Sequence, residues 1–134
     1  KVPEEDSDIK QYLKKRCPFN QVTVMFKKDD VMEAGGYIDW YCEEDYYLWI
    51  RMVKNNFNMK NLPKVMLNMR VNKNLYVRRG GYKYFRNNIF LNKEMLKLGI
   101  INYPFYIFNI VVRFSAQVLM PNKLRELFYK KALR

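Results

Sequence analysis

Three segments of the first half of the chain have the features of helices, and in the third of them the apolar residues recur at helical spacing. Residues Glu4–Arg16 begin acidic and end basic, which suits a helix dipole, and Asp6 or Ser7 can serve as the N-cap. The stretch KKDDVMEAGG predicts a short helix that ends at its two glycines. A third helix is predicted from Glu43 on, because apolar residues return there every three or four positions.

Two other segments alternate between apolar and polar residues, which is the period of a strand. The β-branched stretch QVTVMF, residues Gln21–Phe26, predicts one strand. Residues Phe57–Val71 alternate on either side of Pro63 and predict a pair of short strands. The expected fold class is therefore α+β, predominantly helical, with a small antiparallel strand element.

The second half of the chain has the pattern of helices, at about Tyr82–Leu98, Tyr103–Met120 and Asn122–Leu133. The stretch Gly99–Pro121 is apolar enough to suggest a transmembrane span. Four polar residues interrupt it at spacings of 7, 4 and 4, namely Asn102, Asn109, Arg113 and Gln117. Such a stripe occupies one helical face, so we expect this helix to lie in an interface or a core and not to span a bilayer.

Composition narrows the class of protein. Apolar residues make up 49% of the 134 positions and aromatic residues 16%, which is enough to build a core. The chain has no histidine, so catalysis by histidine and metal sites made of histidine are excluded. Cys17 and Cys42 are too few for a disulfide framework and are expected to be free thiols in a reducing cytosol. The chain starts at Lys1 without a methionine or a signal peptide, so we expect a piece of a longer protein.

The net charge of +12 is distributed unevenly. Residues 1–59 hold 9 Lys/Arg and 11 Asp/Glu, whereas residues 60–134 hold 16 Lys/Arg and 2 Asp/Glu. The basic second part, with a helical tail over residues 82–134, should meet an anionic partner such as phosphates, nucleic acid or a lipid surface. Together with the polar stripe, this charge suggests peripheral docking on an anionic membrane. The same charge could instead belong to a non-enzymatic basic module that binds nucleic acid, which is the rival to the interpretation as an enzyme given below. The sequence contains no recognisable nucleic-acid-binding motif to support this rival.

Three successive carboxylates, Glu43, Glu44 and Asp45, stand at the start of the third predicted helix. Capping explains acids on the solvent side of a helix N-terminus, and we expect Glu43 to do this while facing water. Asp45 differs, because the apolar residues Leu48, Trp49 and Met52 follow it at i+3, i+4 and i+7, on the same face. A carboxylate facing a core or a cleft can act as a general base, although structural sites also hold such groups.

The chain resembles the second half of bacterial family 2 glycosyltransferases, which have a GT-A fold and build cell-surface polysaccharides. The resemblance covers nearly the whole chain from Pro3 and rests on motifs in a fixed order. These are PFNQVTVMF (Pro18–Phe26), AGGY (Ala34–Tyr37), EEDYYLWIR (Glu43–Arg51), RV (Arg70–Val71), RRGG (Arg78–Gly81) and the tail LMPNKLRELFYKKALR (Leu119–Arg134). The chain departs from the family at Gln21, where histidine is frequent, so any acceptor contact made by that position is in doubt.

The resemblance implies that Asp45 is the base, with Glu44 as the acid before it. The base would take a proton from the acceptor hydroxyl, which attacks the anomeric carbon with inversion. The family's donor site lies in its N-terminal half, where a DxD motif holds Mg²⁺ or Mn²⁺. The letters DSD at Asp6–Asp8 fit this motif but follow no apolar strand, so they indicate a helix start, and no metal ligand is expected in this chain. Residues 1–134 would then be the acceptor-side half of the domain, inactive alone.

The substrate contacts expected from the resemblance fall into two groups. Arg78 and Arg79 would clamp the donor pyrophosphate, because the guanidinium fork matches phosphate oxygens, although a solvated basic pair is as good an explanation. The acceptor contacts would be Asn20, Gly35, Gly36 and Trp40. Trp40 is chosen because it lies outside the helix face and next to the glycines, although clustered aromatic residues more often form a core than a platform for a sugar. The partners implied are a nucleotide-sugar donor and a glycan or lipid-linked acceptor, with no nucleic acid. The expected location is cytoplasmic and peripheral, at the inner face of the cell membrane.

Overall fold

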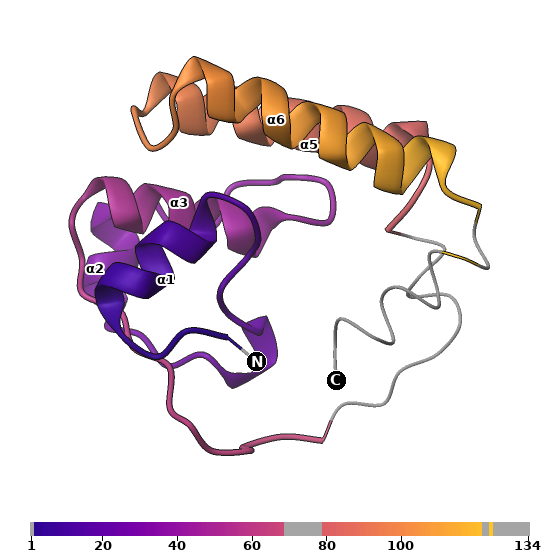
Figure 1. Ribbon diagram of the computed structural model, residues 1–134. Helices are drawn as coiled ribbons and strands as arrows, with labels where there is room; N and C mark the ends of the chain where they lie inside the picture. The colour runs from indigo at the N-terminus through magenta and orange to yellow at the C-terminus, as the bar shows by residue number, and fades with distance from the viewer. Residues whose placement is uncertain (1, 69–78, 122–123, 125–134) are drawn as a thin grey trace. The chain divides into compact units, whose positions relative to one another are not determined.

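The computed structural model describes residues 2–68, 79–121 and 124, and the chain divides into two compact units at residues 68 and 69 (Figure 1). The first unit holds helices α1 (Asp6–Leu13), α2 (Lys28–Glu33) and α3 (Glu44–Lys54), and a 3₁₀ turn η1 (Gln21–Thr23). The second unit holds α5 (Tyr82–Lys97), α6 (Tyr103–Phe114) and a π-helical turn η2 (Ser115–Leu119). The predicted RV motif, Arg78 and the helix at 122–133 lie outside the described residues, apart from Leu124.

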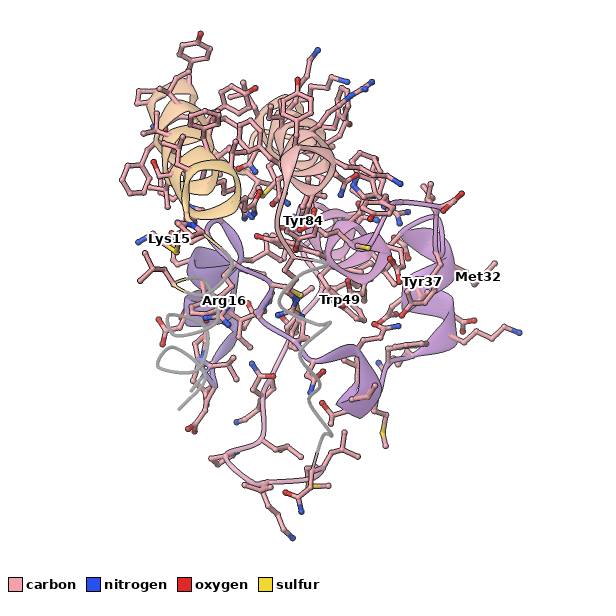
Figure 2. The ribbon with its side chains drawn as sticks, turned by 90° about the vertical axis from the view of Figure 1, so that its right-hand side faces the viewer. Lys15, Arg16, Met32, Tyr37, Trp49 and Tyr84 are labelled. Atoms are coloured by element: carbon pink, nitrogen blue, oxygen red, sulfur yellow. The ribbon has the colours of Figure 1, made fainter. Side chains whose placement is uncertain are left out.

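The core of the first unit forms around α3, as the helical spacing predicts. Leu48, Trp49 and Met52 are all buried, with Trp49 only 2% exposed. Trp49 meets the ring of Phe19 edge to face at a centroid distance of 5.4 Å. Figure 2 shows this indole inside the unit. The Tyr46 hydroxyl donates a hydrogen bond to the Leu13 carbonyl, which ties α3 to the end of α1.

The predicted strands are absent from the described residues, which corrects the α+β assignment to a helical one. In the first segment, the backbone N–H and the hydroxyl of Thr23 both bond the Asn20 carbonyl at 2.9 Å and close a turn. In the second segment, the Met59 N–H donates to Asp6 at 2.9 Å and the Asn61 N–H donates to the Glu4 carbonyl at 3.0 Å. These backbone donors are used by the start of α1 and not by a neighbouring strand.

The same contacts correct the expected cap of α1. Glu5 is the N-cap, and its side chain makes no capping hydrogen bond. Asp6 instead accepts from the ammonium of Lys10 at 2.7 Å and from the Met59 N–H. The side chain of Asn61 adds a bond of 2.7 Å to the Pro3 carbonyl. The acidic start of α1 therefore anchors residues 57–61 of the same unit.

In the second unit, α5 and α6 lie side by side as a helical hairpin (Figure 1). Gly99, with φ +73°, ends the first helix, and the Asn102 side chain caps the second by accepting from the Phe105 N–H at 3.1 Å. The polar stripe of α6 faces α5. Asn109 donates to Asn92 at 2.8 Å, and Arg113 donates to Asn88.

This burial settles which way the stripe is turned. Asn109 and Gln117 are buried, as are Asn88 and Asn92 on α5. The stripe therefore packs in a core, which was one of the two expected roles, and it cannot be the surface that docks on a membrane. Among the described helices, none is long and apolar enough to cross a membrane.

Candidate active site

The three carboxylates lie at the start of α3, and their exposures differ. Glu44 is exposed and Asp45 is half-buried, as helical spacing predicts. Glu43 is only 5% exposed, so the expectation that it faces water is wrong. The residue before it, Cys42, has φ +60°, which turns the chain sharply and places the Glu43 side chain inside the unit.

Asp45 is held by the end of its own helix. One carboxylate oxygen accepts a hydrogen bond of 2.7 Å from the Tyr46 N–H, one of the donors that a helix N-terminus leaves without a partner in the helix. The Tyr47 N–H, one position on, is taken by the Glu43 carbonyl at 2.9 Å. The partial positive charge of the helix N-terminus also favours an ionised carboxylate here. An ionised, oriented carboxylate is what a general base requires.

A loop of two glycines, Gly35 and Gly36, lies beside α3 and is fixed to it by Arg51. The Arg51 guanidinium donates to the Ala34 carbonyl at 2.5 Å and to the Gly36 carbonyl at 2.7 Å. Both glycines have positive φ, +86° and +63°. A Cβ on Gly35 would lie 2.9 Å from the Arg51 guanidinium, so the loop needs glycine there for space as well as for conformation.

Arg51 is thus the residue that joins the glycine loop to the helix carrying Asp45. Burial lowers the pKa of the Arg51 guanidinium, and the neighbouring Tyr47 raises it by less. In the sequence, Arg51 stands out only as the last residue of the EEDYYLWIR motif. Its two carbonyl partners lie 15 and 17 residues away along the chain, and no periodicity links residues at that spacing. Two successive glycines followed by a lone arginine on a helix are the only hint that the sequence offers.

An aromatic stack continues from Arg51. Its guanidinium carbon lies 4.7 Å from the centroid of the Tyr47 ring, and the Tyr47 ring lies 4.5 Å from that of Trp40. The indole Nε1 of Trp40 is buried and has no hydrogen-bond partner among the described residues. One side of the Trp40 ring therefore packs against Tyr47. The buried indole N–H cannot donate a hydrogen bond to a sugar at the surface.

The remaining candidate residues are spread over both units. Asn20 is exposed, and its neighbour Gln21 donates to the Tyr37 hydroxyl at 2.7 Å, which joins two of the motifs that carry the resemblance. Figure 2 shows Tyr37 on the same unit as Trp49. Arg79 is half-buried and belongs to the second unit. The structure thus brings Asp45 and Glu44 near one another on α3, and Gly35, Gly36 and Trp40 around the Arg51 stack.

Comparisons with known proteins point to one class of enzyme. No family model and no solved structure matches the chain. The chain is 39% identical over 134 residues to the UDP-Gal:alpha-D-GlcNAc-diphosphoundecaprenol beta-1,3-galactosyltransferase of Escherichia coli, covering 100% of this chain and 48% of that protein. It is 36% identical over 133 residues to an uncharacterized glycosyltransferase of Haemophilus influenzae, covering 99% and 49% of the two chains.

A third relative is the amylovoran biosynthesis glycosyltransferase AmsE of Erwinia amylovora. It is 31% identical over 134 residues, covering 98% of this chain and 49% of that protein. The chain therefore spans about half the length of the curated relatives that it matches. All three are bacterial proteins named as glycosyltransferases, and they match this chain nearly from end to end.

Proposed function

We propose that the protein containing these 134 residues is a glycosyltransferase of cell-surface polysaccharide synthesis, and that this chain forms the acceptor side of its catalytic domain. The similarity to glycosyltransferases over 98 to 100% of the chain supports the reaction class. The observation that carries the catalytic assignment is the half-buried, hydrogen-bonded carboxylate of Asp45 at the N-terminus of α3. The rival function, a nucleic-acid-binding module, receives no support from these relatives.

In the proposed reaction, Asp45 accepts the proton of an acceptor hydroxyl. The hydroxyl oxygen then forms a bond to the anomeric carbon of the donor sugar, on the face opposite the leaving nucleotide diphosphate. The bond between the anomeric carbon and the diphosphate oxygen breaks, and the diphosphate leaves with its electron pair. One displacement of this kind inverts the anomeric configuration. Glu44, exposed beside Asp45, is proposed to add negative charge that favours proton uptake.

The acceptor is proposed to lie against the glycine loop. Gly35 and Gly36 let a sugar approach the backbone closely, because neither carries a side chain. Trp40 would offer its apolar ring and Asn20 its amide. The backbone of this loop is held in place beside the proposed acceptor, because the Arg51 guanidinium bonds the carbonyls of the residues on either side of Gly35. The E. coli relative is named for an acceptor on diphosphoundecaprenol, so a lipid-linked glycan at the inner face of the membrane is the acceptor that we propose.

The donor is proposed to be a nucleotide sugar whose pyrophosphate meets Arg79, together with Arg78, which lies outside the described residues. The Mg²⁺ or Mn²⁺ that a GT-A fold uses does not fit Asp6 and Asp8. Asp6 is already engaged by the Lys10 ammonium and by the Met59 N–H, and a cation would have to displace both. We therefore propose that the metal site and most of the donor site lie in the part of the protein beyond this chain.

The direct test is a transfer assay on the full-length protein with a panel of nucleotide sugars and a short-chain lipid diphosphate sugar as acceptor. The proposal predicts that one donor is consumed and that the anomeric signal of the product, read by NMR, is inverted relative to the donor. Absence of transfer with every donor, or retention of configuration in the product, would refute it. Binding of random single-stranded DNA without transfer would favour the rival function instead.

A further inference from the structure

The turn η2, which follows α6, has an irregular register, and one of its carbonyls is bonded from outside the helix. The Met120 N–H donates to the Ser115 carbonyl at 3.0 Å, five residues back, which is the hydrogen bond of a π-helix. An α-helix would pair the Gln117 carbonyl with residue 121, but Pro121 has no N–H. Gln117 is only 5% exposed, so its carbonyl takes a hydrogen bond from elsewhere in the second unit.

The donor of that hydrogen bond is the Gly81 N–H, at 2.9 Å. Gly81 is the N-cap of α5 and the last residue of the RRGG motif, so the bond joins the end of this motif to η2. A ring contact supports the same junction, because Phe85 of α5 meets Phe114 of α6 edge to face at a centroid distance of 5.3 Å. The Phe85 N–H also donates to the Gly81 carbonyl, at 3.1 Å. Gly81 is therefore held on both sides of its peptide unit.

Gly81 has a backbone conformation that other residues avoid. Its φ is +86° and its ψ is 167°, a region that is occupied almost only by glycine. Space is not the reason, because a Cβ built on Gly81 would meet no atom within 4 Å. The backbone conformation itself therefore requires glycine, and in this conformation the N–H reaches the Gln117 carbonyl. Residues held in such sparsely populated conformations cluster at active sites and ligand-binding sites.

Arg79 precedes this anchored glycine by two residues. Its side chain is half-buried and makes no hydrogen bond or ion pair with the other residues that the structure describes. The single acidic residue in the sequence from 79 to 121 is Glu94, which the Lys97 ammonium bonds at 2.6 Å. The N–H groups of the Arg79 guanidinium are therefore available to an anion from outside the unit, and their planar arrangement matches two phosphate oxygens.

We propose that Gly81, through its bond to the Gln117 carbonyl, is a positioning residue that holds Arg79 in place for the diphosphate of the donor. The inference rests on the proposed function, in which Arg79 contacts that diphosphate, and it adds η2 as the anchor. With the anchor, the backbone next to Arg79 is already ordered before the donor binds. Without it, the donor must order this backbone on binding, and ordering one residue weakens affinity by about tenfold.

The test compares the diphosphate affinity of wild type and Gly81→Ala in the full-length protein. Calorimetry with UDP, GDP and dTDP, each with Mg²⁺, identifies the nucleoside diphosphate that wild type binds. Gly81→Ala adds a methyl group in open space and keeps the N–H, but alanine disfavours a φ of +86°, so the N–H turns away from the Gln117 carbonyl. We expect this variant to bind the diphosphate about tenfold more weakly, and to raise the KM for the nucleotide sugar about tenfold with kcat little changed.

The matched control is Gly99→Ala, at the other end of α5. Gly99 also has a positive φ, +73°, and a Cβ there also meets no atom within 4 Å. Both variants strain the backbone of the same hairpin, so urea denaturation should find them destabilised to a similar degree. Only Gly81→Ala should lose affinity for the diphosphate. If the two variants bind the diphosphate equally, Gly81 is a structural glycine of the hairpin and the proposal is wrong.

Hydrogen exchange in wild type tests the same claim without a variant, and it decides the matter if Gly81→Ala does not fold. A diphosphate that binds the anchored conformation stabilises it, so at about ten times the dissociation constant the Gly81 N–H should exchange about tenfold more slowly. The Gly99 N–H, which bonds the Leu96 carbonyl at 3.1 Å, should exchange as before. An exchange rate of the Gly81 N–H that the diphosphate does not change would contradict the proposal.

The results separate this inference from the proposed function. Sugar transfer by a protein whose two glycine variants bind diphosphate equally would keep the function and overturn the inference. Weaker diphosphate binding by Gly81→Ala alone, in a protein that transfers no sugar, would refute the function and leave the inference standing. If wild type binds none of the three diphosphates, the inference is overturned.

Discussion

Replacing Arg51 by lysine separates the geometry of its contacts from its charge. The Arg51 guanidinium bonds two carbonyls at once, those of Ala34 and Gly36, at 2.5 and 2.7 Å. A lysine ammonium at the same position keeps the positive charge, but as a point donor on a flexible stem it does not reproduce the planar fork. We therefore expect Arg51→Lys to lose one of the two bonds and the stacking on Tyr47.

The magnitude follows from these contacts. A hydrogen bond from a charged donor contributes about 1.5–3 kcal/mol, and a buried carbonyl left without a partner adds to the loss. Arg51 is half-buried, so water can replace some of the lost hydrogen bonding to the two carbonyls. We therefore expect the free energy of unfolding of the first unit to fall by about 1–2 kcal/mol. The matched control is Arg16→Lys, an exposed arginine of the same unit, with an expected change within about 0.5 kcal/mol.

Two measurements check this prediction in the full-length protein. Urea denaturation gives the difference in unfolding midpoint between the two lysine variants. Hydrogen exchange gives a local signal, because the Gly36 N–H bonds the Val31 carbonyl at 2.8 Å and should exchange faster when the loop is released. If Arg51→Lys is as stable as Arg16→Lys and protects the Gly36 N–H as wild type does, Arg51 does not fix the glycine loop.

Two further predictions concern buried polar groups. Glu43→Gln should lower the free energy of unfolding by about 1–3 kcal/mol, because a carboxylate that is only 5% exposed needs hydrogen-bond partners, and its charge strengthens those bonds. The control Glu44→Gln changes an exposed carboxylate and should leave the free energy of unfolding nearly unchanged. The urea midpoints of the two variants test this difference. Asn109→Ala should cost about 1–3 kcal/mol by leaving the Asn92 side-chain oxygen without its donor at 2.8 Å, as measured by thermal unfolding. An Asn109→Ala variant that melts like wild type would show that the amide contacts between α5 and α6 do not stabilise the hairpin.

Helices with a strong apolar period could be predicted from the sequence. The spacing of Leu48, Trp49 and Met52 predicts α3 and its buried face, and the structure confirms both. The α5 and α6 helices are confirmed in the same way, since glycine and proline mark their ends and apolar residues recur inside them.

The strands could not be predicted correctly, because a strand depends on a partner that a local pattern does not reveal. The stretch QVTVMF has the composition of a strand, yet Val22 is 62% exposed and Met25 is 96% exposed in the structure. With no neighbouring strand among the described residues to bond its backbone, the local turn at Asn20 and Thr23 decides the conformation instead.

The candidate site could be predicted only in part, because a local pattern does not show the contacts that distant parts of the chain make. Helical phase distinguishes the half-buried Asp45 from the exposed Glu44, but it gives the wrong environment for Glu43, which precedes the helix and follows the left-handed turn at Cys42. The polar stripe of α6 was visible as a pattern, whereas its direction was not, because Asn88 and Asn92 accept its hydrogen bonds from a different helix.

The central claim is that Asp45 is the base, and single-turnover transfer by the full-length protein tests it most directly. Asp45→Asn keeps the shape of the side chain and can still accept from the Tyr46 N–H, but it removes the proton acceptor. We predict a fall of about 10²–10⁴-fold in the transfer rate with donor affinity retained, and the matched variant Asp39→Asn, an exposed carboxylate in the same unit, should react like wild type. A rate for Asp45→Asn equal to that of Asp39→Asn would contradict the assignment.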